Sequence, residues 1–336
     1  MSTVKISDTG IEVNKNGFGA LPIQRISADE AVGLLRRAYD GGITYFDTAR
    51  AYSDSETKLG MAFEGMREKI YIATKCFASD TEGFWNQLRK SLAELRTDYV
   101  DFYQFHNPER AYEPGDCTGM YEAALEAKRQ GLIRHIGFTN HRLAVAKLAL
   151  ESGLYEIIQY PVSFLSSEAE LDFVRDAGEK NITIIGMKSL AGGLITNARA
   201  AYGFASRFPN LLPIWGVQRA GELEEFLEYV KNPPELDEAL LREIEEDKAQ
   251  LGGDFCRGCG YCLPCPAGID IPTCARMSLL LRRAPNAWYL SEEWAENMGK
   301  IEACVACGHC AQCCPYSLDT PALLRANLAD YRNFKR

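Results

Sequence analysis

The stretch Gly42-Ile-Thr-Tyr-Phe-Asp-Thr-Ala-Arg-Ala-Tyr52 contains a short β-prone run that ends in an acidic residue. Such runs recur as far as Lys231 and alternate with segments of helical periodicity, for example 28–39, 83–95 and 168–179. Counted from a first strand at 17–21, the pattern predicts eight strand–helix units of roughly 29 residues each, which suits a (β/α)8 TIM barrel better than a six-stranded doubly wound sheet. The other expected strands are 42–46, 69–74, 100–105, 133–138, 155–159, 182–186 and 211–216.

The composition excludes several classes of protein. The 336 residues include 46% apolar residues and carry a formal charge of 37 − 46 = −9, which excludes a disordered or fibrous chain. The acidic balance disfavours binding to nucleic acid, which needs a basic face. The first residues contain no apolar signal core, and every apolar run is shorter than the roughly 18 residues that span a bilayer. We therefore expect a cytoplasmic protein with no nucleic-acid or membrane partner.

The cysteines divide the chain into two parts. Only Cys76 and Cys117 of the twelve lie in the first 255 residues, and ten lie in the last 81. Without a secretory signal, this density indicates metal ligands in a reducing compartment and not a disulfide framework. The Asn-Pro-Pro-Glu run at 232–235 breaks the barrel pattern, and 235–250 resembles a charged helix. We expect a barrel domain over 1–232, a linker helix within 233–253 and a cysteine-rich domain over 254–336.

The cysteine-rich part contains an internal repeat, in which the eight residues from Cys265 to Pro272 match those from Cys314 to Pro321 in spacing. We therefore expect two related halves packed face to face. Each half has four closely spaced cysteines followed by proline, the run that holds [4Fe–4S] clusters in bacterial two-cluster ferredoxins. Because the cysteine before the proline usually ligates the other cluster, the runs predict one cluster on Cys256, Cys259, Cys262 and Cys314 and another on Cys304, Cys307, Cys310 and Cys265.

The first run departs from this pattern, because two residues and not three precede its last cysteine. A single cluster in the second half and two structural zinc sites are therefore alternatives. Cys274 falls in a helical stretch, where we expect it to pack as a small apolar residue. The role of Cys313 stays open.

Polar residues follow several of the expected barrel strands, where a TIM barrel places its chemistry. Asp47 and Tyr52 follow the second strand, Lys75 the third and His106 the fourth. In this order, and with Gly137-Phe-Thr-Asn140 and Gln159-Tyr160, the set resembles the catalytic tetrad of the aldo-keto reductase family. The resemblance covers nearly all of residues 5–230. With the cysteine-rich end, the chain is similar to the subset of that family that carries a small, helical, ferredoxin-like C-terminal domain.

The resemblance implies hydride transfer between a nicotinamide and a carbonyl carbon. Tyr52 would be the general acid, although a tyrosine with its ordinary pKa near 10 is a poor acid at neutral pH. The ammonium of Lys75 would favour the phenolate, Asp47 would hold and balance Lys75, and His106 would orient the carbonyl. Each residue alone also fits a structural role, as a surface charge, a helix cap or a core histidine.

The resemblance also implies residues that bind NADP or NAD. Thr139, Asn140 and Gln159 would hydrogen-bond the carboxamide, and Gly192 and Gly193 would let the backbone approach the pyrophosphate. Three positions depart from the common pattern. Met187 replaces the aromatic that usually stacks on the nicotinamide, Lys188 replaces a small residue, and Gln218-Arg219 offers one arginine to a 2′-phosphate where Glu222 stands in place of another.

The two halves together predict an NAD(P)-dependent oxidoreductase that acts on a small-molecule carbonyl or alcohol, with clusters that relay electrons to or from a redox protein partner. Two alternatives stay open. One is an ordinary carbonyl reductase with structural clusters, and the other is a non-catalytic electron carrier whose barrel only binds a ligand. The substrate, the oligomeric state and the electron partner are not readable from the sequence.

Overall fold

The computed structural model describes residues 2–251, 255–283 and 286–334. Its contacts divide the chain into two compact units. The first comprises the residues up to Ser189 together with Ala198–Leu241, and the second comprises Leu190–Asn197 together with Arg242–Arg336. The expected boundary at 253 and 254 lies outside the described residues, and the domain limits stay a prediction.

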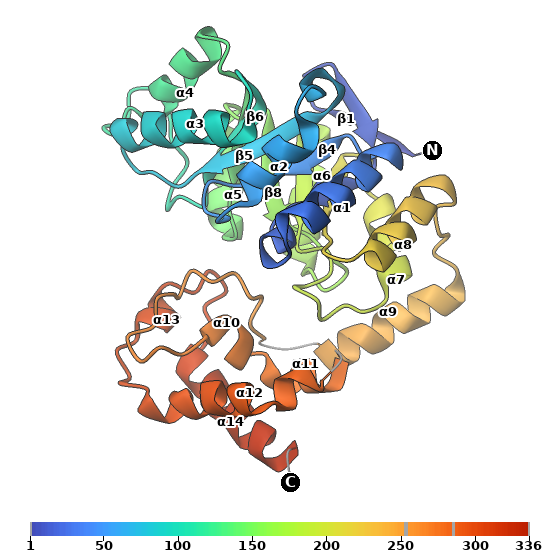
Figure 1. Ribbon diagram of the computed structural model, residues 1–336, viewed down its shortest axis with the longest axis vertical. Coiled ribbons are helices and arrows are strands. Elements are labelled where there is room, and N and C mark those ends of the chain that lie inside the picture. Colours follow the sequence, from blue (N-terminus) through green and yellow to red (C-terminus); the bar gives the residue numbers. More distant parts are fainter. Residues whose placement is uncertain (1, 252–254, 284–285, 335–336) are drawn as a thin grey trace. The chain divides into compact units, whose positions relative to one another are not determined.

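The first unit is a closed barrel of eight parallel strands, as expected (Figure 1). Each strand pairs with the next along the chain, and β10 pairs with β3 to close the ring. The strands are β3 (Gly17–Gly19), β4 (Tyr45–Asp47), β5 (Tyr71–Cys76), β6 (Val100–His106), β7 (Ile133–Thr139), β8 (Ile157–Pro161), β9 (Thr183–Met187) and β10 (Leu211–Gly216).

Helices alternate with these strands, and local sequence explains where they begin. Ser27 caps the first of them, since its hydroxyl accepts a hydrogen bond from the Glu30 amide and the Glu30 carboxylate accepts one from the Ser27 amide. The helices of this unit are α1 (Ala28–Asp40), α2 (Ser55–Phe63), α3 (Thr81–Leu95), α4 (Met120–Arg129), α5 (Leu143–Ser152), α6 (Glu168–Glu179), α7 (Ala198–Ser206) and α8 (Ala220–Lys231), with 3₁₀ turns η1 (Pro22–Arg25) and η2 (Arg67–Lys69).

An antiparallel hairpin, β1 (Thr3–Ile6) and β2 (Ile11–Asn14), precedes the barrel and was not predicted. Its alternating apolar side chains pack in one cluster with buried barrel residues such as Tyr45 and Phe102. The Ser7 hydroxyl donates to the Glu156 carbonyl, and the Ser7 amide donates to the hydroxyl of Thr183, the first residue of β9. The hairpin therefore closes the end of the barrel where strands begin, opposite the end where polar residues gather.

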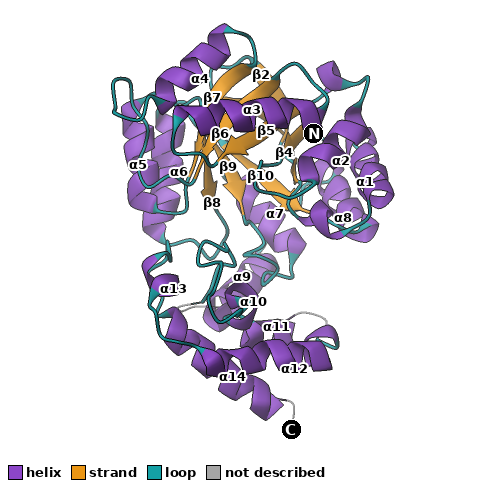
Figure 2. Ribbon diagram, turned by 60° about the vertical axis from the view of Figure 1, so that its left-hand side comes forward, coloured by secondary structure: helices purple, strands orange, loops and turns teal. Residues whose placement is uncertain are grey.

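The second unit contains helices and no strand among its described residues (Figure 2). Its apolar core includes Met277, Trp294, Met298, Leu324 and Tyr331, with Cys274 fully buried among them, as expected for a packing residue. Its elements are α10 (Ile271–Cys274), α11 (Met277–Arg283), η3 (Trp288–Leu290), α12 (Glu292–Gly299), η4 (Lys300–Ala303), α13 (His309–Gln312) and α14 (Thr320–Phe334), and α9 (Glu238–Leu251) leads into it at the place of the expected charged helix. No helix in the described part of the chain is both long and apolar enough to cross a membrane.

Candidate active site and cysteine clusters

Lys75 and Asp47 form a buried ion pair inside the barrel. Lys75 Nζ lies 2.7 Å from both carboxylate oxygens of Asp47 and donates to the Thr48 carbonyl at 2.6 Å. Their side chains are 1% and 3% exposed. Burial lowers the pKa of Lys75 and raises the pKa of Asp47, while their mutual attraction acts in the opposite direction. The Lys75 ammonium is thereby held away from solvent at the ends of the strands.

Tyr52 and His106 complete the group that the sequence predicts. Lys75 Nζ lies 5.3 Å from the centre of the Tyr52 ring, and that ring meets the His106 ring edge to face at 6.0 Å between centroids. Burial, and then the charge of Lys75, lowers the pKa of His106 to about 3. Its Nδ1 is buried without a hydrogen-bond partner among the described residues. His106 is therefore a neutral imidazole that can donate or accept a hydrogen bond beside Tyr52.

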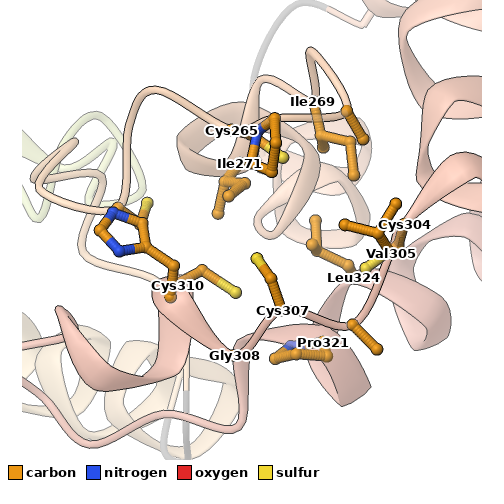
Figure 3. Close-up of a pocket in the computed structure, with 15 residues that line it drawn as sticks. Cys265, Ile269, Ile271, Cys304, Val305, Cys307, Gly308, Cys310, Pro321 and Leu324 are labelled. Atoms are coloured by element: carbon orange, nitrogen blue, oxygen red, sulfur yellow. The ribbon is translucent and has the colours of Figure 1, made fainter.

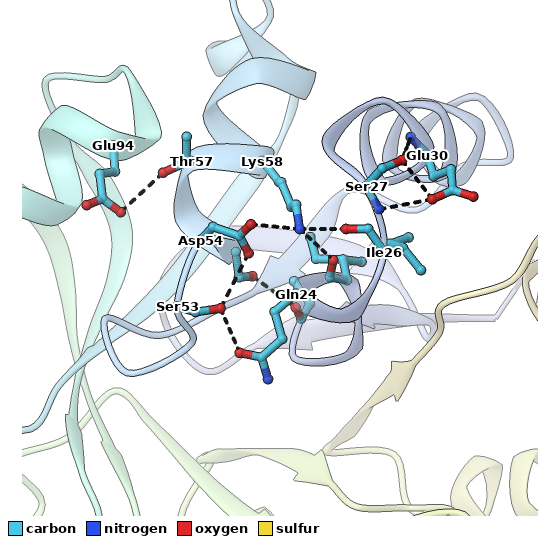
Figure 4. Close-up of polar contacts among 12 residues, drawn as sticks. Gln24, Ile26, Ser27, Glu30, Ser53, Asp54, Thr57, Lys58 and Glu94 are labelled. Atoms are coloured by element: carbon cyan, nitrogen blue, oxygen red, sulfur yellow. Dashed lines mark hydrogen bonds and ion pairs between the residues drawn. The ribbon is translucent and has the colours of Figure 1, made fainter. Parts of the chain in front are cut away.

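The segment that carries Tyr52 is anchored by a second buried lysine (Figure 4). Lys58 Nζ donates to the carbonyls of Ile23 and Ile26 at 3.0 and 2.7 Å and pairs with Asp54 at 2.8 Å. The Ser53 hydroxyl donates to the Gln24 side chain at 2.9 Å. These contacts tie the residues directly after Tyr52 to the turn that follows β3, so the phenol is held by a loop with few degrees of freedom.

Two glutamines surround Asp47, and only one was predicted. Gln104 Nε2 donates to Gln159 Oε1 at 2.9 Å, and both amides approach the Asp47 carboxylate at 3.4 Å. Gln159, expected to bind a carboxamide, thus also supports the ion pair. Gln104 was missed, although it lies two residues before His106 on β6 and therefore shares its face of the strand.

The structure brings the predicted carboxamide residues to neighbouring strand ends. Thr139 pairs in register with His106 on one side and with Gln159 on the other. Asn140 Nδ2 donates to the Pro108 carbonyl at 2.8 Å, and its Oδ1 accepts from the Arg142 amide at 2.9 Å. The Asn140 side chain thus also joins the loops that follow β6 and β7.

A second histidine at these strand ends, His141, was not predicted. Burial, and then the positive charge of Lys188, holds the pKa of His141 well below its usual range. Met187 ends β9 as a buried side chain, and Lys188 follows it with a positive φ of 55°. Lys188 is therefore a cationic neighbour of His141 at the end of β9.

The predicted 2′-phosphate residues lie where β10 leads into α8. Arg219 donates to Glu222 Oε1 at 2.8 Å, while the amides of Gln218 and Arg219 each donate to Glu222 Oε2 at 3.1 Å. A carboxylate therefore already fills the anion position at this helix N-terminus and neutralises the one arginine. The two predicted pyrophosphate glycines, Gly192 and Gly193, lie in the segment 190–197 of the second unit.

A cavity in the second unit joins the two cysteine runs (Figure 3). It is lined by Cys265 of the first run and by Cys304, Cys307 and Cys310 of the second, the four residues predicted to share a cluster, and also by Cys262. Apolar side chains such as Ile271 and Leu324 form its wall. Thiol donors in an apolar shell fit an iron–sulfur cluster.

The other predicted ligands gather around the first run. Burial, and then the neighbouring Cys259 and Cys256, raises the pKa of Cys262 to about 12. The Arg257 guanidinium lies 3.9 Å from the Phe255 ring centre and 5.6 Å from that of Tyr316, two residues after Cys314. The first run and the end of the second therefore approach each other, as a crossed ligand set requires.

In the described part of the chain, no three histidine, cysteine or acidic side chains are grouped closely enough to hold one metal ion. A cluster distributes its four thiolates over four iron atoms, whereas zinc gathers its ligands within about 2.3 Å of one centre. Cys313 Sγ faces His309, 3.6 Å from Nδ1.

Sequence models of known families match both parts of the chain. Residues 15–205 match the aldo/keto reductase family, and residues 255–319 match a 4Fe-4S dicluster domain. Aldo-keto reductase YhdN of Bacillus subtilis is 29% identical over 215 residues, 58% of this chain and 64% of that protein, and L-galactose dehydrogenase of Arabidopsis thaliana is 29% identical over 210 residues, 57% and 66% respectively. The match thus spans less than two thirds of the length of these curated relatives.

Solved structures share the fold of the barrel. An aldo-keto reductase from Klebsiella pneumoniae, crystallised with NADPH, superposes with a TM-score of 0.64 at 20% identity and covers 73% of this chain and 94% of its own. At this identity the likeness concerns the fold.

We expect His106 to stay neutral from pH 8 to pH 5, because burial and Lys75 lower its pKa to about 3. An NMR titration of the histidine ring signals, with His106→Gln to assign the resonance, should find the His106 signal unchanged over this range. A titration centred near the ordinary pKa of about 6.5 would contradict the buried, neutral imidazole.

We expect Cys314 and its neighbour Cys313 to differ in iron binding, because only Cys314 belongs to the crossed ligand set. Cys314→Ser should lower the iron content from about eight to about four atoms per chain, and Cys313→Ser should leave about eight. The iron and acid-labile sulfide contents of both variants, measured on protein purified without oxygen, test this difference. Equal loss in both variants would contradict the assignment.

Proposed function

The chain belongs to the aldo/keto reductase family and carries a 4Fe-4S dicluster domain, and we propose that it interconverts a small-molecule carbonyl compound and its alcohol with a nicotinamide cofactor, while the clusters relay electrons. The observation that carries this proposal is the buried Lys75–Asp47 pair beside Tyr52 and the neutral His106. A buried ammonium beside a phenol favours the phenolate and so makes the tyrosine a better general acid near neutral pH.

In the reductive direction, the Tyr52 hydroxyl gives its proton to the carbonyl oxygen. A bound, reduced nicotinamide supplies the hydride that the carbonyl carbon accepts. The Lys75 ammonium stabilises the phenolate left on Tyr52, and Asp47 keeps Lys75 oriented towards that ring. Because His106 is neutral, it orients the carbonyl oxygen by a hydrogen bond and does not compete with Tyr52 as the acid.

We assign the nicotinamide end of the cofactor to Thr139, Asn140, Gln159, Met187 and Lys188. This assignment is supported by the register that aligns Thr139 with His106 and Gln159. The pyrophosphate falls to Gly192 and Gly193, both of which have positive φ angles, 69° and 92°. Gln218 and Arg219 face the adenosine ribose.

We assign the electron relay to two clusters on the crossed cysteine sets, with a redox protein as partner in the cytoplasm. The cavity that gathers Cys265, Cys304, Cys307 and Cys310 supports the crossed set. Hydride transfer to a carbonyl needs no cluster, so a dicluster domain on the same chain favours a step in which single electrons enter or leave.

The function is tested with Tyr52→Phe. Loss of the proton donor should lower reduction of a panel of small aldehydes, ketones and 2-oxo acids by a hundredfold or more, while binding of the dinucleotide stays within about twofold. Tyr229→Phe is the matched control, since the Tyr229 hydroxyl donates to Glu225, one turn earlier on α8. Unchanged turnover in Tyr52→Phe would refute the proposed acid.

The cofactor preference is tested at Glu222. Its carboxylate occupies the anion position of α8, so we expect the chain to bind NADH more tightly than NADPH, and Glu222→Gln to improve NADPH binding by about two- to fivefold. Titration by nucleotide fluorescence measures both affinities. Glu224→Gln is the control. It removes another carboxylate of α8, one that pairs with Arg37 of α1. Tighter binding of NADPH than of NADH by the unmodified protein would contradict the role assigned to Glu222.

A further inference from the structure

The segment 190–197 follows β9 along the chain but makes its contacts with the second unit. Two arginines of that unit hold its backbone. Arg276 Nη1 donates to the Gly192 carbonyl at 2.9 Å, and Arg283 Nε donates to the Leu194 carbonyl at 2.8 Å. Arg283 also donates to Gln250 at 2.7 Å and pairs with Asp247. The backbone of segment 190–197 is therefore held by hydrogen bonds at two carbonyls, those of Gly192 and Leu194.

Arg276 also touches the first cysteine run. A Cβ placed on Gly258 would lie 2.9 Å from the Arg276 guanidinium carbon, and a Cβ placed on Gly192 would lie 2.7 Å from its Nη1. The guanidinium thus lies against both glycines, in space that any other residue would fill. The Gly258 amide in turn donates to Cys256 Sγ at 3.3 Å. One side chain therefore connects the Gly192 backbone with the loop between Cys256 and Cys259.

The Arg276 guanidinium is held in place by a hydrogen bond of its own. Its Nε donates to the Pro272 carbonyl at 2.8 Å, which fixes the direction of the guanidinium. The internal repeat extends to this residue, because Arg276 and Arg325 each follow the proline of their repeat by four positions. Arg325 is exposed on α14. Because the first copy of this arginine bonds to the glycine segment, Arg325 provides a matched comparison.

We propose that Arg276 is a positioning residue that couples cluster binding at Cys256 and Cys259 to dinucleotide binding at Gly192 and Gly193. This inference rests on the proposed function, in which these glycines contact the pyrophosphate. With the thiolates of Cys256 and Cys259 committed to a cluster, the Gly258 backbone is fixed and Arg276 holds the Gly192 carbonyl in place. Without the cluster, the loop and the arginine lose that support.

The coupling acts through order in the backbone. A glycine segment with positive φ angles loses much conformational freedom when it binds a ligand, so a segment already held by Arg276 binds at lower entropic cost. Because coupling between two sites is reciprocal, dinucleotide binding should also stabilise the cluster of the first run. The cluster thereby influences cofactor affinity in addition to any electron transfer.

The experiment compares dinucleotide affinity in protein reconstituted with iron and sulfide, measured without oxygen by NADH and NADPH fluorescence. The Arg276 and Arg325 variants keep both clusters, and Cys256→Ser lacks the first. Arg276→Gln should weaken binding about tenfold, Arg276→Lys less, and Arg325→Gln by less than about twofold. Cys256→Ser should weaken binding by a similar factor with Arg276 intact. Arg276→Gln binding as tightly as the unmodified protein, or Arg325→Gln weakening it equally, would overturn the proposal. So would unchanged affinity in Cys256→Ser.

The reciprocal readout is resistance of the iron to a chelator. In the unmodified protein, saturating dinucleotide should raise the chelator concentration that removes half of the first cluster's iron, and in Arg276→Gln it should have no effect. Arg283→Gln, which loosens the same segment without touching the cysteine run, should keep the protection. Protection that persists in Arg276→Gln overturns the coupling. If the unmodified, loaded protein binds neither NADH nor NADPH, the proposed function itself has failed.

Discussion

The buried Lys75–Asp47 pair is the interaction on which the barrel site depends. Taking two charges out of water costs more than their attraction returns unless the geometry is good and the remaining polar atoms are satisfied. The strand register supplies that geometry, because Asp47 at the end of β4 pairs with Ala73, which places Lys75 two residues further along β5 on the same face of the strand. Gln104, Gln159 and the Thr48 carbonyl supply the remaining hydrogen bonds. Removing either charge alone would leave the other buried, at a cost of about 3–5 kcal/mol.

The barrel and the tetrad were predictable because strand ends and periodicity are local signals. All eight predicted strands are present, and the four polar residues placed at strand ends meet. The β1–β2 hairpin was missed because its role depends on packing against barrel residues far along the chain, including Ile157 and Leu212. Gln104 carries no motif, although the alternation of β6 indicates its inward face. His141 has no such signal, since its position depends on the loop that follows β7.

The cysteine runs and the crossed pairing of their ligands were both predicted from spacing. The cavity that gathers Cys265 with the second run matches the crossed set despite the shortened first spacing. What sequence spacing cannot reveal is the support around the thiols. The apolar core packs Cys310 with Met277 and Leu324, so folding of this unit and binding of its metal are coupled energetically.

The segment 190–197 belongs to one part of the chain by sequence and to the other by its contacts. By sequence it is a loop between a barrel strand and a barrel helix, and a barrel loop is expected to pack with its own barrel. Its contacts instead belong to the cysteine-rich unit, where two arginines hold its carbonyls. A loop held in this way has its conformation set by the unit that binds the metal.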